Sequence, residues 1–230
     1  LGISVAGFLG AGFLIIPSVI HLIATNRKPL LTKKLLMILI FVLALGVSYA
    51  GYVRSFSPYP LSPGMDLFTH IYVIKNILHN SYASPLVYPQ TFDMLVALGS
   101  DTFKADLVEI FWAGPFLTFS LFSVSLYGMS YWLSKNHIHS IIATIIGVSI
   151  TEMGLVANLQ FLFPSSFVMS IFPMTVPVID FLWLRSNLGV KIPIICTSII
   201  LLGISLIHLE LGVVISSIIF VYLAIFHYTA

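Results

Sequence analysis

Long apolar runs, separated by shorter polar segments, occupy most of the chain. A helix needs about 20 predominantly apolar residues to cross the roughly 30 Å hydrocarbon core of a bilayer. Runs of this kind predict seven membrane spans, at residues 2–24, 35–53, 107–133, 138–158, 163–184, 192–208 and 211–228. The pattern therefore predicts an all-α fold, a polytopic bundle of transmembrane helices that forms one domain over residues 1–230, with no soluble domain.

The segment 54–106 is the longest stretch that lies between two predicted spans. Pro63 and Gly64 break the preceding structure, and Asp66 follows where a carboxylate stabilises the N-terminus of a helix. Apolar residues then recur at three- and four-residue spacing for about fourteen residues, while Asp66 and His70 share a neighbouring stripe. This length is too short to cross a bilayer, so we expect an amphipathic helix along the membrane surface, with its polar groups facing water or a cleft.

Composition supports a membrane location. Of the 230 residues, 59% are hydrophobic and only 8% are charged, whereas about 25% are charged in ordinary soluble domains. The sequence thus indicates an integral, multi-pass membrane protein. Its net charge of +2 and its scattered basic residues give no nucleic-acid signal. The chain starts at Leu1 and ends in an apolar run, from which we expect a piece of a longer protein.

The charged residues predict an orientation, because cytoplasmic loops retain Lys and Arg. Counting alternate loops from the first one gathers seven of the ten basic residues on one side: Arg27, Lys28, Lys33, Lys34, Lys135, Arg185 and Lys191. Seven of the eight acidic residues then lie on or near the other side. We therefore expect the segment 54–106 to be extracytoplasmic, and the plasma membrane of a prokaryote to be the location.

Three carboxylates stand within or beside predicted spans, where a charge at the helix centre costs about 2.5–3.5 kcal/mol. Asp180 precedes Trp183 and Arg185 at an inner span end, which favours a local ion pair that reaches the interface. Glu152 and Glu210 lie near outer span ends, at the level of the helix that begins at Asp66. We expect these two to line a cavity.

The residues permit several kinds of chemistry. Asp66 could act as a general base beside His70, and the same pair at four-residue spacing could supply two metal ligands. No cofactor is predicted, and a divalent metal ion stays open. His208 and Glu210 stand at the predicted outer face. Structural alternatives are a helix cap for Asp66, a surface position for His70 and an interfacial packing role for His208.

The motifs of the outer segment resemble those of the multi-spanning C-type glycosyltransferases. The resemblance rests on Pro63-Gly64-Met65-Asp66 through His70, on Tyr88-Pro89 about twenty residues later, on a Phe163-Pro164 turn, and on a late histidine, His208. It covers roughly residues 35–230. This sequence has Leu67 where the family often has a second acidic residue, Asp93 where a histidine is common, and Leu209 where a proline often follows the late histidine.

The resemblance implies transfer of a sugar from a polyprenyl-phosphate donor to an acceptor hydroxyl at the extracytoplasmic face. It implies that Asp66 deprotonates the acceptor, that His70 shapes the donor phosphate site, and that His208 approaches the same cavity. Lys75, Lys104 or Arg54 could neutralise the leaving phosphate. Tyr88 and the carboxylates Glu152 and Glu210 complete the candidate cavity, and the expected partners are the lipid-linked sugar and membrane lipid.

Two alternatives remain. In the first, Glu152, Asp180 and Glu210 line the path of a polytopic transporter or channel, which predicts midplane charges, broken helices and related halves. The sequence has no convincing internal repeat. In the second, the chain is a non-catalytic membrane subunit in which Asp66 contacts only protein. The transferase hypothesis predicts that Asp66, His70, His208 and Glu210 open onto one outward cavity, within about 15 Å of one another.

Overall fold

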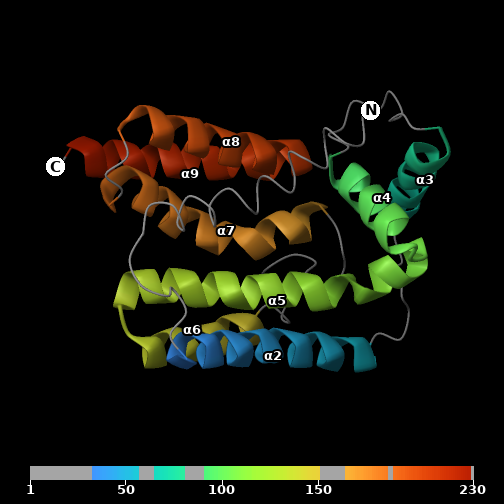
Figure 1. Ribbon diagram of the computed structural model, residues 1–230, viewed down its shortest axis with the longest axis horizontal. Helices are drawn as coiled ribbons and strands as arrows, with labels where there is room; N and C mark the ends of the chain where they lie inside the picture. The colour runs from blue at the N-terminus through green and yellow to red at the C-terminus, as the bar shows by residue number, and fades with distance from the viewer. Residues whose placement is uncertain (1–32, 57–64, 81–90, 151–163, 186–188, 229–230) are drawn as a thin grey trace.

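The computed structural model describes residues 33–56, 65–80, 91–150, 164–185 and 189–228 (Figure 1). Within these ranges the chain forms helices and no strand, which confirms the predicted all-α fold. The elements are α2 (Lys33–Phe56), α3 (Met65–Asn80), α4 (Thr91–Phe103), α5 (Leu107–Ser134), α6 (His137–Ile150), α7 (Pro164–Asp180), the short π-helix η2 (Phe181–Arg185), α8 (Lys191–Ile207) and α9 (Leu209–Tyr228).

Three helices are long and apolar enough to cross a membrane, over Lys34–Tyr52, Leu107–Ser134 and Pro164–Trp183. They belong to α2, α5 and α7 with η2, and they indicate a membrane protein. The predicted spans 192–208 and 211–228 coincide with α8 and α9, and the part of 138–158 that the structure describes, to Ile150, is α6. The apolar stretches described in these three helices are shorter: His137–Ser149, Lys191–Ile207 and Leu209–Ile225. The predicted span 2–24 lies outside the described residues, so the count of seven spans stays a prediction.

The long helices lie roughly side by side (Figure 1). The helices α5 to α9 alternate in direction, so that the starts of α5 and α7 and the turn between α8 and α9 lie at the same end as the last residues of α2. The pair α3 and α4 lies at this end, which we call the α3–α4 end. Lys34, Lys135 and Lys191 belong to the ends of α2, α5 and α8 that lie at the opposite end (Figure 1).

Close packing between the long helices depends on small residues. A Cβ atom at Gly46 of α2 would lie 2.7 Å from the carbonyl oxygen of Phe119 in α5. Buried hydroxyls bond within their own helix: Ser123 Oγ donates to the Phe119 carbonyl at 2.7 Å, and Thr144 Oγ1 donates to the Ser140 carbonyl at 2.7 Å. Because these hydroxyls need no partner on a neighbouring helix, they allow the backbones to approach closely.

The start of α5 is fixed by a capping box. The Val108 N–H donates to Asp106 Oδ1 at 3.0 Å, and the Asp106 N–H donates to Glu109 Oε2 at 3.3 Å. Negative charge at this position also suits the positive end of the helix dipole. The capping box therefore determines where the α3–α4 pair joins the long helices.

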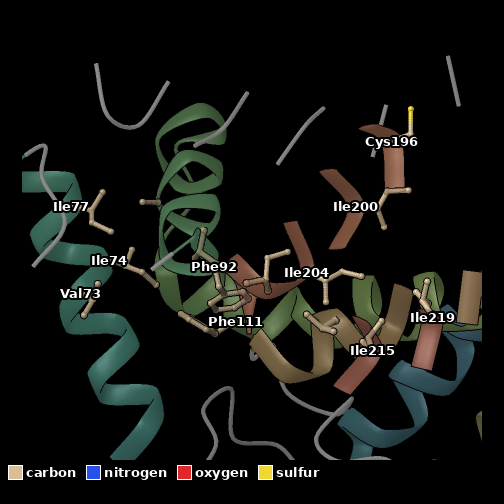
Figure 2. Packing of buried hydrophobic residues seen from close by; sticks show 14 of the residues in the cluster. Val73, Ile74, Ile77, Phe92, Phe111, Cys196, Ile200, Ile204, Ile215 and Ile219 are labelled. Atoms are coloured by element: carbon tan, nitrogen blue, oxygen red, sulfur yellow. The ribbon is translucent and has the colours of Figure 1, made fainter. Parts of the chain in front are cut away.

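The α3–α4 pair shares a hydrophobic core with α5, α8 and α9. Figure 2 shows side chains from α3 that point toward Phe92 of α4 and Phe111 of α5. Ile204 of α8 belongs to the same buried cluster. Further buried members are Val73, Ile74, Ile77, Val96, Ala97, Ile200, Ile207, Ile215 and Ile219. Burial of this apolar surface holds the α3–α4 pair against the end of the bundle.

Candidate functional site

The helix predicted after Gly64 is present as α3, which begins at Met65 and ends at Asn80. Asp66 is therefore in its first turn, as expected. Val73, Ile74 and Ile77 are at most 2% exposed and form the face of α3 that packs on the core. This face also includes His70, which is 7% exposed. The alternative that His70 is a surface histidine is wrong, and its ring does not face water as the amphipathic pattern suggested.

The partner of His70 is Asp93, in the first turn of α4. His70 Nδ1 lies 2.7 Å from Asp93 Oδ1, and Asp93 is 3% exposed. The Phe92 ring meets the imidazole edge to face, with 5.6 Å between the ring centroids. The sequence analysis predicted no helix over residues 91–103 and no role for Asp93, which stands where the resembled family commonly has a histidine. The structure thus brings together two ionisable groups that are 23 residues apart.

The geometry of this pair fixes the imidazole in one orientation. An ionised carboxylate only accepts hydrogen bonds, so His70 Nδ1 donates its proton to Asp93. The other ring nitrogen, Nε2, then accepts a proton when the ring is neutral and donates one when the ring is charged. A carboxylate that orients a histidine in this way is a recurring arrangement for general acid–base catalysis. Burial also makes each partner dependent on the other, because an unpaired buried charge is costly.

Asp66 lies one helical turn before His70, so the register of α3 puts the two residues on the same side of the helix. The side chain of Asp66 lies outside the described part of the structure. The predicted contact between Asp66 and His70 is therefore neither confirmed nor excluded, and the base function of Asp66 stays a prediction.

The two lysines proposed for the leaving phosphate, Lys75 and Lys104, have no contact with His70 among the interactions that the structure describes. Lys75 is exposed, and it follows His70 by five residues, which is about 140° around the helix at 3.6 residues per turn. Lys104 follows the last residue of α4 with a left-handed backbone, φ 52°. Its Nζ donates to Asp101 Oδ1 at 2.8 Å, and both side chains are largely exposed. The structure therefore separates Lys75 from the buried face that carries His70.

His208 and Glu210 lie at the turn between α8 and α9. The His208 N–H donates to the Ile204 carbonyl at 2.9 Å and ends α8. His208 Nδ1 accepts the Leu211 N–H at 3.4 Å and so caps α9, while Glu210 is exposed in the first turn of α9. Since Ile204 and Ile207 share the core with α3 and α4, this turn lies at the α3–α4 end, as expected. The packing role anticipated for His208 is also present.

The remaining predictions concern Tyr88, Glu152 and a possible metal ion. Tyr88 and Glu152 lie outside the described residues. Within the ranges that the structure describes, no group of three or more His, Cys, Asp or Glu side chains could hold a metal ion. The described residues therefore add no support to the metal-ligand alternative for Asp66 and His70.

Asp180 is 3% exposed and connects three helices. Its Oδ2 accepts Trp132 Nε1–H from α5 at 2.7 Å, and its Oδ1 accepts the Tyr222 hydroxyl from α9 at 2.8 Å. Trp183, three residues after Asp180, donates its Nε1–H to Thr197 Oγ1 at 2.9 Å. The expected ion pair of Asp180 with Arg185 stays a prediction. The side chain of Arg185 lies outside the described residues. Local sequence could not reveal the Asp180 partners, because they are 48 and 42 residues away.

Comparison with known protein families, curated proteins and solved structures found no match for this chain. A functional assignment therefore depends on the residues and geometry described above.

Proposed function

We propose that the protein is a membrane glycosyltransferase that moves a sugar from a polyprenyl-phosphate donor to an acceptor hydroxyl at the α3–α4 end. In this proposal the chain crosses a prokaryotic plasma membrane seven times and the α3–α4 end is extracytoplasmic. The observation that carries the proposal is the buried His70–Asp93 pair, which orients an imidazole one helical turn after Asp66.

Asp66 is the general base of the proposed reaction. Its carboxylate takes the proton of the acceptor hydroxyl while the hydroxyl oxygen attacks the anomeric carbon of the sugar. The bond between that carbon and the phosphate oxygen breaks, and the polyprenyl phosphate leaves with the electron pair. His70 carries an Nε2–H beside the Nδ1–H that Asp93 accepts only when its ring is protonated. In this proposal donor binding displaces the packing that covers the ring, and Nε2–H then donates a hydrogen bond to the phosphate and stabilises its developing charge. A single displacement needs no covalent enzyme intermediate and inverts the anomeric configuration.

The location of the α3–α4 pair supports this chemistry. A polyprenyl chain stays in the hydrocarbon core while its phosphate remains at the membrane surface, so the reacting groups should meet at the end of a spanning bundle. Both α2 and α5, which flank the α3–α4 pair in sequence, are long and apolar enough to cross a membrane. The turn that carries His208 and Glu210 lies at the same end, where it could contribute to the same site.

The transporter alternative receives less support from the described carboxylates. Both oxygens of Asp180 accept hydrogen bonds from α5 and α9, which suits a fixed connection between helices better than an ion path. Glu210 is exposed at one end of the bundle, not at its middle. Of the carboxylates in this alternative, Asp180 is thus used in helix packing, while Glu152 lies outside the described residues.

Substitution of Asp66 tests the proposal. Asp66→Asn keeps the shape of the side chain and removes the base, so the rate of sugar transfer should fall by a factor of about 10²–10⁴. The matched control is Asp101→Asn, which removes a carboxylate from the neighbouring helix α4 and should keep the wild-type rate. Transfer from radiolabelled polyprenyl-phosphate sugars would be measured in vesicles that contain each purified variant. An unchanged rate for Asp66→Asn would reject the catalytic assignment.

A further inference from the structure

The face of α3 that points away from α4 carries a stripe of aromatic and basic side chains. Phe68 is 63% exposed and Tyr72 is 64% exposed, and Lys75 and His79 are exposed as well. Their spacings of four, three and four residues place all four within about 60° of the helix circumference. We call these four residues the α3 outer stripe. It lies opposite the buried face that carries His70 and the core residues of α3.

The composition of the α3 outer stripe matches a membrane interface. Aromatic rings favour the headgroup level, where the ring is in a partly apolar medium and a polar edge can reach water. The aliphatic part of a lysine can lie along the same apolar layer while its ammonium group reaches the phosphates. The stripe contains two basic side chains and no carboxylate. These basic groups favour a membrane surface that contains anionic headgroups over one that contains only zwitterionic headgroups.

The connections of α3 keep the stripe close to a bilayer. Only residues 57–64 separate α3 from the end of α2, and eight residues reach at most about 28 Å. After α4, only residues 104–106 precede α5. Both α2 and α5 are long and apolar enough to cross a membrane. A helix attached in this way remains within a short distance of the headgroups, so lipid is the partner available to its exposed face.

We propose that the α3 outer stripe binds the surface of the surrounding bilayer, with Phe68 and Tyr72 at the boundary between headgroups and acyl chains. Lys75 and His79 contact the phosphates of anionic phospholipids. This assignment reverses the orientation that the sequence pattern suggested, because the face with His70 packs on protein and the aromatic face is the one that meets lipid. It does not depend on the proposed transferase activity.

The depth of a nitroxide spin label at Tyr72 tests the proposal. Cys196 is the only cysteine of the chain, so Cys196→Ala gives a background in which Tyr72→Cys can be labelled alone. Collision of the label with oxygen, which concentrates in lipid, would be compared with collision with a water-soluble nickel chelate. In phosphatidylcholine vesicles that contain phosphatidylglycerol, we expect oxygen to dominate. A label at Asp101, an exposed position on α4, serves as the control and should favour nickel.

Charge reversal then tests the phosphate contact. Lys75→Glu should reduce the lipid-immersed population of the Tyr72 label by about fivefold or more in phosphatidylglycerol vesicles, because each basic group near an anionic surface contributes on that scale. The matched variant Lys104→Glu reverses another exposed lysine at the α3–α4 end and should leave the label in place.

Four results would overturn the proposal. Dominant nickel collisions at Tyr72 would show that the stripe faces water. Protection from both reagents would show that protein covers it, either another segment of this chain or a second copy. Equal immersion in vesicles with and without phosphatidylglycerol, or an unchanged immersion in Lys75→Glu, would refute the contact with anionic phosphate.

Discussion

The buried pair between α3 and α4 predicts a large energetic coupling. His70 Nδ1 and Asp93 Oδ1 are 2.7 Å apart, and their side chains are only 9% and 4% exposed. Removal of either partner takes away the buried group that the other one binds at hydrogen-bond distance, which costs about 3–5 kcal/mol. We therefore expect His70→Ala and Asp93→Ala each to destabilise the protein by about this amount. The double variant should cost less than the sum by about 2–3 kcal/mol, because neither charge is then left behind.

A second ion pair in the same segment is a matched control. Lys104 Nζ and Asp101 Oδ1 are 2.8 Å apart, almost the same distance, but their side chains are 80% and 68% exposed. Solvent screens this pair, so the corresponding alanine cycle should give a coupling energy below about 1 kcal/mol.

Both cycles would be measured by unfolding the purified protein from mixed micelles with sodium dodecyl sulfate, followed by circular dichroism. The midpoint and slope give the free energy of unfolding for the wild type, the single variants and the double variants. If the coupling energy between His70 and Asp93 were no larger than that between Lys104 and Asp101, burial would not strengthen the His70–Asp93 interaction. The fixed orientation of the imidazole, on which the proposed reaction depends, would then lose its physical basis.

Further predictions concern the long helices and the α8–α9 turn. Gly46→Ala should destabilise the protein by about 1–3 kcal/mol in thermal unfolding, because its Cβ would meet backbone atoms of α5. The Cβ of Gly51→Ala meets nothing within 4 Å, so this variant should stabilise the protein by up to about 1 kcal/mol. Equal effects would contradict the close approach of α2 and α5. Tyr222→Phe removes one hydrogen bond to a carboxylate and should cost about 1.5–3 kcal/mol, and Asp180→Ala should cost more because two donors lose this acceptor. The reverse order in chemical unfolding would refute the three-helix connection. His208→Ala should cost at most about 1 kcal/mol of stability, since it removes one long capping bond. It should lower the transfer rate at least tenfold if this side chain contributes to the site. A loss of rate no larger than the loss of folded protein would leave His208 with its capping role alone.

Local sequence signals predicted the long helices and α3. Hydropathy averages over about twenty neighbouring residues, so the apolar runs at 35–53 and 107–133 were sufficient to locate α2 and α5. Gly64 and Asp66 together marked the start of α3, because a helix-breaking residue followed by a carboxylate is a local signal.

The contacts between helices could not be predicted in the same way. The helix α4 has 13 residues and mixed polarity, so it lacks a long apolar run. A usable signal was present, since Asp93 follows a Tyr-Pro pair and precedes apolar residues at helical spacing, as first-turn carboxylates do. Nothing local connects Asp93 with His70 or Asp180 with Trp132, because tertiary packing selects these partners over 23 and 48 residues.

The central claim is that this protein consumes a lipid-linked sugar. The most direct measurement is to incubate the purified wild-type protein in vesicles with a panel of polyprenyl-phosphate sugars and to quantify released polyprenyl phosphate by mass spectrometry. We predict that at least one donor is consumed, that the release requires an acceptor alcohol, and that Asp66→Asn lowers the rate of release by a factor of about 10²–10⁴. Release of no polyprenyl phosphate from any donor by the wild-type protein, or equal release by the Asp66→Asn variant, would contradict the claim.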